Sequence, residues 1–301
     1  MDLKTEIREF LTSRRGNLTP DQAGITAYGA RRVPGLRRSE LAALAGVSVE
    51  YYTRIERGNL SGVSDNVIEA IAGALKLDDA ERAHLFDLAR ASQPAATTRR
   101  RRATRQQVRP NVQWVLDSIT GAAAFVSNGS HDILAANQLG EALWSPLYAN
   151  VDRPVNSARY LFLDPTAREM YPDWERIANE TVAIMRRTAG ADPRDRRLSE
   201  LVGELAVRSE EFRTRWASHN VRFHNTGTKR FMHPLVGELT LNFERFDLAA
   251  ENGLTMFTYT AEPGSRSENA LNSSTAGHTP STASNPHARL TKAEAKRDRQ
   301  D

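Results

Sequence analysis

The 301-residue chain contains no cysteine. This absence excludes a disulfide framework, a cysteine-ligated zinc finger and a thiol nucleophile, and it is typical of proteins from a reducing compartment. The sequence also lacks an apolar run near the roughly 20 residues that a membrane-spanning helix needs, and its N-terminus lacks the apolar core of a signal peptide. We therefore expect a cytoplasmic protein with no membrane contact, and the 40% hydrophobic content is enough for packed cores.

Patterns typical of enzymes are missing as well. The sequence has no glycine-rich phosphate loop, and Ser127 and Ser145 lack the flanking glycines of a nucleophile elbow. His219, His224 and His233 have no cysteine or paired carboxylate at the spacing of a metal site. We expect no catalytic residue, no metal and no cofactor, and predict that the chain is not an enzyme.

The net charge is small, +4, and the surplus lies mainly in one short segment. Residues 1–90 hold 13 basic and 13 acidic residues, residues 91–110 hold six basic and no acidic ones, and residues 111–265 hold 16 against 20. The arginine-rich segment lies between Pro94 and Pro110, which is typical of a linker. Two interpretations are open, because these arginines either contact DNA phosphates or form a solvated hinge.

These shifts in composition divide the chain into four regions. We predict an all-α domain at 1–92, the arginine-rich linker at 93–110, an α+β domain at 111–265 and a tail at 266–301. The tail is rich in small polar residues and has too few large apolar ones to fold alone, so we expect it to be disordered.

Five helices are predicted in the N-terminal domain, because apolar residues recur there at helical spacing. Two of the helices are short and are separated only by Gly46-Val47-Ser48. Glycine in the turn and a small residue, Ala42 or Ala45, at the helix crossing meet the requirements of a helix-turn-helix. The predicted helices lie near residues 3–14, 40–45, 49–57, 67–75 and 85–89.

The second helix of a helix-turn-helix enters the major groove of DNA with its first residues, while the preceding helix crosses the backbone. Arginine can bind guanine, glutamate can accept from cytosine, and serine or tyrosine can reach a phosphate or a base. Alternatives stay open for Ser48, which can simply cap its helix, and for Arg54, which can pair with Glu40. The candidate DNA contacts are Arg37, Arg38, Ser48, Glu50, Tyr51 and Arg54, the first two as phosphate contacts.

The C-terminal domain begins with a helix near 112–119. Two short strands, 123–127 and 133–135, flank an Asn-Gly pair, which is a strong hairpin signal. Further helices follow, and residues 238–244 then alternate between apolar and polar, with a matching strand at 254–260. This order predicts an α+β domain with an antiparallel sheet and helices on one face.

A small-molecule site in such a domain is expected to be half apolar with a few polar groups. Core packing is the favoured alternative for the aromatic candidates, and a buried hydrogen bond to the backbone is the alternative for Asn137 and His233. Arg159 either holds a carboxylate or pairs with Asp164. The candidates are Asn137, Arg159, His219 and His233 as polar groups, with Phe162, Trp174, Phe212 and Trp216 as apolar walls.

Two groups of residues resemble a known family. Gly-Leu-Arg-Arg at 35–38 with Tyr-Tyr-x-Arg-Ile-Glu at 51–56 is similar to the helix-turn-helix of XRE-family regulators, in the branch with an MmyB-like C-terminal domain. Segments at 156–162 and 233–237 resemble that domain, and the resemblance covers roughly residues 3–271. The chain departs from the pattern at Ala136, where the family commonly has a large aromatic residue.

The resemblance implies a lambda-repressor-like N-terminal domain and a PAS-like C-terminal domain. It also implies a homodimeric transcription regulator that binds a double-stranded DNA operator and senses a small amphipathic or fatty-acid-like molecule. The alternative is that the C-terminal domain serves only dimerisation or protein partner binding, without a ligand.

Overall fold

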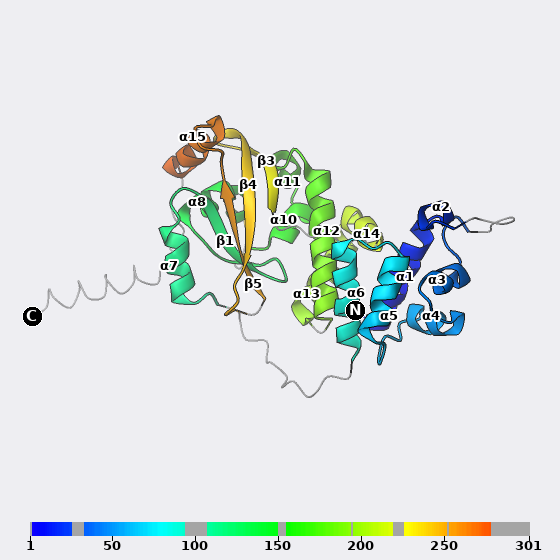
Figure 1. Cartoon of the computed structure of the whole chain (residues 1–301). Coiled ribbons are helices and arrows are strands. Elements are labelled where there is room, and N and C mark those ends of the chain that lie inside the picture. The colour runs from blue at the N-terminus through cyan, green and yellow to red at the C-terminus, as the bar shows by residue number, and fades with distance from the viewer. Residues whose placement is uncertain are drawn as a thin grey trace, which may run out of the picture. The chain divides into compact units, whose positions relative to one another are not determined.

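The structure is a computed structural model of the whole chain, and it describes residues 2–25, 33–93, 107–149, 155–193, 195–218, 226–251 and 253–277. The chain forms two compact units (Figure 1). The first unit takes its described residues from Met1–Thr104 and Glu175–His224, and the second takes them from Arg105–Trp174 and Asn225–Asp301. No helix in the described ranges is long and apolar enough to cross a membrane.

The described N-terminal region of the first unit consists of helices. The five predicted helices correspond to α1, α3, α4, α5 and α6. The capping pattern Thr19-Pro20-Asp21-Gln22 also predicts a short turn of helix, and α2 confirms it, because it begins at Pro20 and the Thr19 hydroxyl accepts from the Gln22 N–H. The bounds are α1 Leu3–Asn17, α2 Pro20–Ala23, α3 Arg38–Leu44, α4 Val49–Glu56, α5 Asp65–Ala74 and α6 Asp79–Ser92.

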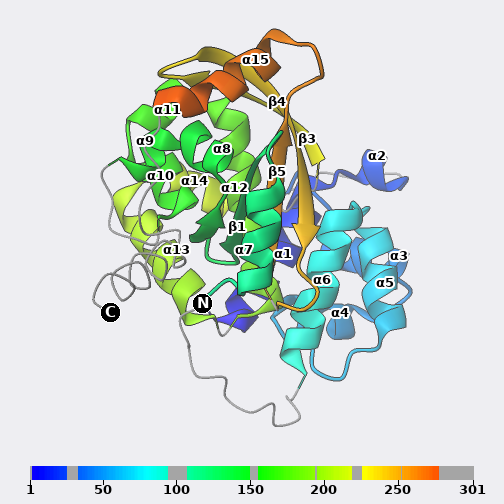
Figure 2. The ribbon, with the colours of Figure 1, turned by 90° about the vertical axis from the view of Figure 1, so that its left-hand side faces the viewer.

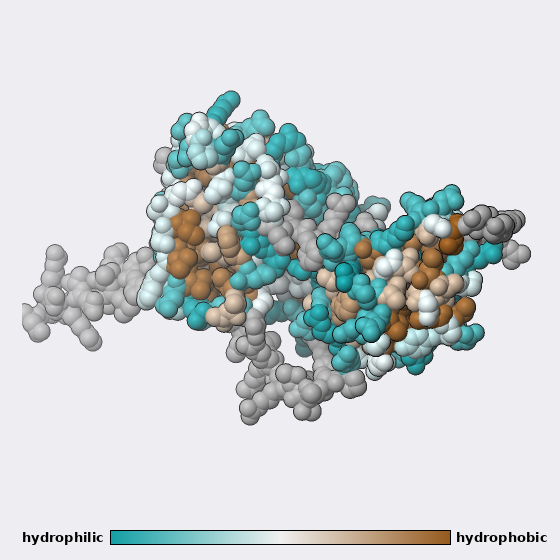
Figure 3. All heavy atoms as spheres, in the orientation of Figure 1, coloured by the Kyte–Doolittle hydropathy of each residue, from teal (hydrophilic) through white to brown (hydrophobic). Residues whose placement is uncertain are grey.

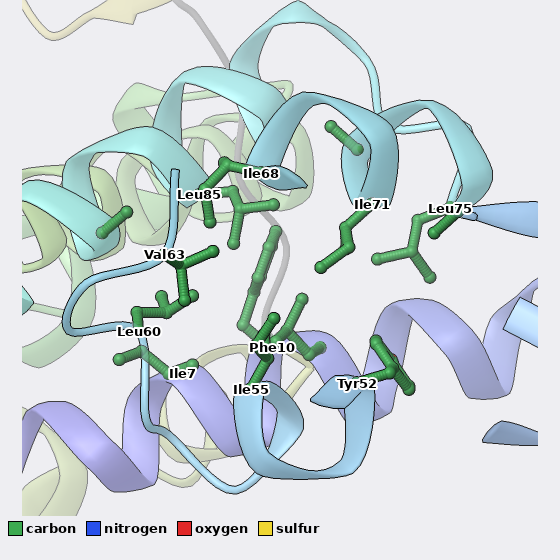
Figure 4. Packing of buried hydrophobic residues seen from close by; sticks show 14 of the residues in the cluster. Ile7, Phe10, Tyr52, Ile55, Leu60, Val63, Ile68, Ile71, Leu75 and Leu85 are labelled. Carbon is green, nitrogen blue, oxygen red and sulfur yellow. The ribbon is translucent and has the colours of Figure 1, made fainter. Parts of the chain in front are cut away.

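One hydrophobic core holds these helices together (Figure 4). Ile7 and Phe10 of α1 lie in it with Tyr52 and Ile55 of α4, and all four side chains are fully buried. Burying a side chain of this size contributes about 1.5–3 kcal/mol, so the apolar stripes fix where each helix lies. The opposite sides of α3 and α4 remain in solvent.

Three helices from later in the chain belong to the first unit, except for Trp174 at the start of the first of them, which belongs to the second unit. The sequence assigns residues 111–265 to one C-terminal domain, but the segment Glu175–His224 packs with the N-terminal helices. The helices are α12 Trp174–Ala191, α13 Arg196–Arg208 and α14 Glu210–Ala217.

The contact between α12 and the N-terminal helices explains this grouping. Arg186 of α12 is fully buried and donates from Nη1 to the Glu6 carboxylate of α1. Gly190 of α12 lies so close to α6 that an added Cβ would be 2.4 Å from Cε1 of His84. A buried ion pair and a glycine contact therefore join segments that are far apart in the sequence.

The second unit contains a five-stranded antiparallel sheet in the order β2-β1-β5-β4-β3 (Figure 2). This confirms the predicted α+β, PAS-like class, the predicted hairpin of β1 and β2, and the predicted strands β4 and β5. The sequence did not predict β3. The bounds are β1 Ala123–Asn128, β2 Ile133–Ala136, β3 Thr226–His233, β4 Gly237–Asp247 and β5 Leu254–Thr260.

Helices cover both faces of this sheet, so the expectation of one covered face is wrong. Neighbouring residues of a strand point to opposite faces. Accordingly, Ala124 and Val126 of β1 pack with Leu116 of α7, whereas Phe125 between them contacts Trp144, at the end of α8. The helices are α7 Pro110–Ser118, α8 Gln138–Leu143, α9 Ser145–Tyr148, α10 Ser157–Leu163 and α11 Thr166–Met170.

The chain beyond β5 is folded further than the sequence predicts. The expectation of disorder from residue 266 is wrong for the first part of the tail, because α15 (Arg266–Ser273) and a 3-10 turn, η1 (Ser274–Gly277), follow the sheet. Leu271 is only 1% exposed, and the Ser267 hydroxyl accepts from the Thr240 N–H of β4 at 3.0 Å. Residues 278–301 and linker residues 94–106 lie outside the described part of the chain.

Candidate functional site

The turn between α3 and α4 has the geometry of a helix-turn-helix. Gly46 has a φ of +65°, a left-handed conformation that glycine adopts without strain. Ala42 and Ala45 are buried, as the close crossing of two helices requires. The Ser48 hydroxyl accepts from the Tyr51 N–H at 3.1 Å, which confirms the capping interpretation. These contacts fix the start of α4, whose first residues are exposed.

The solvent-facing side of this helix pair carries the candidate DNA contacts. The Arg54 guanidinium lies 4.8 Å from the centre of the Tyr51 ring, a typical cation–π distance. Glu40 accepts from the Arg37 N–H at 2.7 Å and so caps the start of α3. Tyr51 is half-buried, and exposed beside it are Arg37, Arg38, Ser48, Glu50 and Arg54.

A buried carboxylate beneath this face is a feature that sequence reasoning missed. The side chain of Glu56 is 2% exposed and accepts from Arg15 Nε at 2.6 Å and from the Tyr52 hydroxyl at 3.2 Å. Arg38 Nε donates to the other oxygen of the same carboxylate. Burial, followed by the nearby Glu56 charge, raises the pKa of Tyr52. The cluster ties α1, α3 and α4 together, and a glutamate within the apolar stripe of α4 was the available signal.

Arg38 is therefore in contact both with the interior of the domain and with the solvent. Its Nε is bound inside the domain, while 52% of its side chain is exposed. The exposed part of the Arg38 side chain is accessible to a DNA phosphate, so the phosphate contact stays a prediction. The bond to Glu56 fixes the orientation of the guanidinium.

In the second unit, the structure places Asn137 and His233 in buried hydrogen bonds to the backbone. The Asn137 side-chain oxygen accepts from Ala124 N–H and Gly140 N–H, and its amide donates to two carbonyls, so four hydrogen bonds are made. His233 Nδ1 accepts from the Leu235 N–H, so Nε2 carries the proton and donates to the Ala142 carbonyl at 3.0 Å. Both side chains therefore stabilise the fold through hydrogen bonds to the surrounding backbone.

Four of the remaining candidates form two aromatic pairs, one described in each unit. Phe162 and Trp174 pack edge to face at 6.0 Å in the second unit, where Trp174 Nε1 donates to the Leu161 carbonyl. Phe212 and Trp216 stack at 5.5 Å in the first unit. Arg159 is exposed, and His219 lies outside the described residues.

An aromatic cluster that sequence reasoning missed fills the face of the sheet under α8. Trp144 is central, because its Nε1 donates to the Tyr171 hydroxyl at 3.0 Å and its ring contacts Phe231 and Tyr259 edge to face. Burial raises the pKa of Tyr171. Ala136, the departure from the family pattern, is buried on β2 opposite Phe125.

Comparison with known families agrees with these observations. A family model for the MmyB-like transcription regulator ligand binding domain matches residues 108–273, more than half of the chain. A model for a helix-turn-helix domain matches residues 7–85. No curated protein matches the chain. With its helix-turn-helix preceding the five-stranded domain, the chain belongs to the MmyB-like transcription regulators.

Proposed function

We propose that the protein is a ligand-responsive transcription regulator and not an enzyme. The helix-turn-helix binds an operator in double-stranded DNA, and the MmyB-like region binds a small molecule that changes this affinity. The observation that carries the proposal is the row of exposed polar side chains, Arg37, Glu50 and Arg54, on helices fixed by a fully buried core. Arginine and glutamate on a rigid helix can read base edges in the major groove.

The effector class that the family resemblance favours is a small amphipathic molecule, fatty-acid-like compounds included. Sites for such ligands combine an apolar wall with a few polar groups. The alternative, a C-terminal region that serves only dimerisation or protein contacts, remains the competing proposal.

A homodimer is part of the proposal, and α7 is the surface that supports it. Trp114 and Val115 on this helix are 57% and 50% exposed, and hydrophobic residues gather over it in Figure 3. A second copy covering α7 would remove these side chains from water. Dimeric helix-turn-helix proteins bind half-sites about 34 Å apart, so the operator is expected to be a palindrome with that spacing.

The test is selection of genomic DNA fragments on the purified chain, with and without a lipid extract of the cells. We expect one family of palindromic sites whose recovery changes when the extract is present, and a small molecule in the purified protein by mass spectrometry. Operator binding that no extract alters, together with an empty protein and no thermal shift, would favour the dimerisation-only alternative. Recovery of random fragments would contradict operator reading itself.

A further inference from the structure

Val49 is an apolar residue next to the polar candidate DNA contacts. It is the first residue of α4, and 40% of it is exposed. Ser48 and Glu50, its neighbours in the chain, are exposed as well. Single exposed apolar residues are common on protein surfaces, so the meaning of Val49 depends on the position that it occupies.

The packing of α4 directs the start of this helix outward. Tyr52 and Ile55 are fully buried and point from α4 into the core of the first unit (Figure 4). With 3.6 residues per turn, Glu50 and Arg54 lie on the opposite side, and Val49 lies at the border between the two sides. The first residues of the second helix in a helix-turn-helix contact base edges in the major groove. The position of Val49 is therefore one that reaches the bases.

Local structure fixes the orientation of Val49. The Ser48 hydroxyl accepts from the Tyr51 N–H, and the Ser48 carbonyl accepts from the Tyr52 N–H at 3.0 Å. These two bonds hold the first turn of α4, and a valine in a helix has one strongly preferred side-chain rotamer. The exposed part of Val49 therefore has a defined orientation, so that little side-chain entropy is lost when a binding partner covers it.

An apolar side chain in the major groove can distinguish one base from the others. Thymine presents a 5-methyl group there, and adenine, guanine and cytosine do not. Valine cannot donate or accept, so against a polar base edge it would displace water without replacing its hydrogen bonds. Against a methyl group it removes apolar surface from water on both sides, which contributes about fourfold in affinity for one buried methyl group.

The charges around Val49 are complementary to DNA. Residues 37–57 have one exposed acidic residue and four exposed basic ones, namely Glu50 against Arg37, Arg38, Arg54 and Arg57. Such a positive surface attracts DNA phosphates without regard to sequence. The surroundings of Val49 thus favour double-stranded DNA as the partner that covers it, and sequence discrimination is left to the side chains that reach the bases.

We propose that Val49 recognises thymine in the operator by contact with its 5-methyl group, beside the bases that Glu50 and Arg54 contact. The proposal rests on the proposed function and deepens it, because it names one base of each half-site and the group on that base that is recognised. Uracil pairs with adenine as thymine does but lacks the methyl group, so this contact can be removed from the DNA alone.

The DNA test begins with an operator that the purified full chain selects from random duplex DNA. Each thymine position of the half-site is then replaced by deoxyuridine, one position at a time and in both half-sites. We expect one position at which the replacement lowers the affinity at least about fourfold. A half-site without thymine, or one in which no deoxyuridine lowers the affinity, would overturn the proposal.

The protein test asks whether Val49 is the residue that contacts this methyl group. Val49→Ala is expected to weaken binding to the thymine operator at least about fourfold and to bind the thymine and deoxyuridine operators equally. Because the position is exposed and alanine is the better helix former, the urea midpoint should not fall. A Val49→Ala protein that still loses fourfold in affinity on the deoxyuridine operator would assign the methyl contact to another residue and overturn the proposal.

Leu44→Ala is the matched control. Leu44 is also 40% exposed, but it lies at the end of α3, the helix that precedes the turn. This variant is expected to retain the full difference between the thymine and deoxyuridine operators. Loss of that difference in Leu44→Ala as well would show a general disturbance of the helix pair and overturn the assignment to Val49.

The two levels of the argument fail differently. A chain that selects no operator from random duplex DNA would overturn the proposed function. A chain that selects an operator but binds its thymine and deoxyuridine forms equally would overturn the role of Val49 and leave the proposed function standing.

Discussion

Arg38 donates to the buried carboxylate of Glu56, and this contact connects the exposed face of the helix-turn-helix to its interior. Arg15 and Tyr52 bind the same carboxylate, so three elements of the domain share one negative charge. The side chains that present the DNA-binding face are thus oriented by a group that DNA cannot reach.

Glu56→Gln is expected to lower the free energy of unfolding by about 3 kcal/mol, because it removes the charge that two arginines share in a buried site. Urea unfolding at neutral pH measures this. The matched control is Glu50→Gln on the same helix, where the side chain is exposed and the change is expected to stay within about 0.5 kcal/mol. Equal stability of the two variants would show that the Glu56 cluster contributes little.

Arg54→Ala is expected to relax the preference for operator over random DNA by about 1–3 kcal/mol, because Tyr51 holds this guanidinium on the exposed side of α4. Binding titrations on both DNAs measure the preference. Arg90→Ala removes the same charge from α6, where the side chain is 76% exposed, and should not change the preference. Equal weakening on both DNAs by Arg54→Ala would reassign Arg54 to a phosphate contact.

Gly190→Ala is expected to destabilise the first unit by about 1–3 kcal/mol, because its Cβ would lie 2.4 Å from the His84 ring between α12 and α6. Gly73→Ala is the matched control. It lies within α5 with no atom within 4 Å of the added Cβ, and it should stabilise by about 0.5–1 kcal/mol. Unfolding curves decide the outcome, and stabilisation by both changes would contradict the close packing of α12 on α6.

Glu6 is expected to make stability depend on pH in the acid range. Burial raises its pKa, but His84 and Arg186 outweigh this and lower the pKa from 4.5 to about 2. A carboxylate whose pKa is lower in the folded state stabilises the fold at pH values above its ordinary pKa, and this stabilisation is lost as the pH falls toward 2. The contribution of Glu6 ionisation to the free energy of unfolding is therefore expected to fall from about 3 kcal/mol at pH 7 to about 1 kcal/mol at pH 3.

The measurement for Glu6 compares urea unfolding of wild-type and Glu6→Gln protein at the two pH values. The difference in the free energy of unfolding between the two proteins should be smaller at pH 3 than at pH 7. Glu9→Gln, on an exposed position of the same helix, should follow the wild type within about 0.5 kcal/mol. A gap that is constant from pH 7 to pH 3 would contradict the depressed pKa.

The elements that could be predicted from the sequence are those that local rules specify. The helix-turn-helix follows from Gly46 at the turn, Ser48 at the cap and an apolar stripe through Tyr52 and Ile55, all within a few residues. Strand β4 follows from the strict alternation of apolar and polar residues at 238–244, and β5 follows from a matching run of strand-forming residues at 254–260. In each of these cases neighbouring residues carry the whole signal.

What could not be predicted depends on partners that are distant in the sequence. Arg186 and Glu6 are 180 residues apart, and each sits in the apolar stripe of its helix, so only the two together explain their burial. Strand β3 was missed because it lies at the sheet edge and buries few residues, Phe231 and His233 among them. An apolar pocket lined by Leu198, Val202 and Trp216 is likewise formed by α13, α14 and the end of α12, which no local pattern brings together.

The return of Glu175–His224 to the first unit means that the chain passes between the two units three times. Dissection at the predicted boundary after residue 92 would therefore sever that unit. A fragment ending there would carry Glu6 and His84 without the helix that covers them, and the remainder would carry Arg186 without its carboxylate. A single protease cut in the linker would still leave the units tethered at two other places.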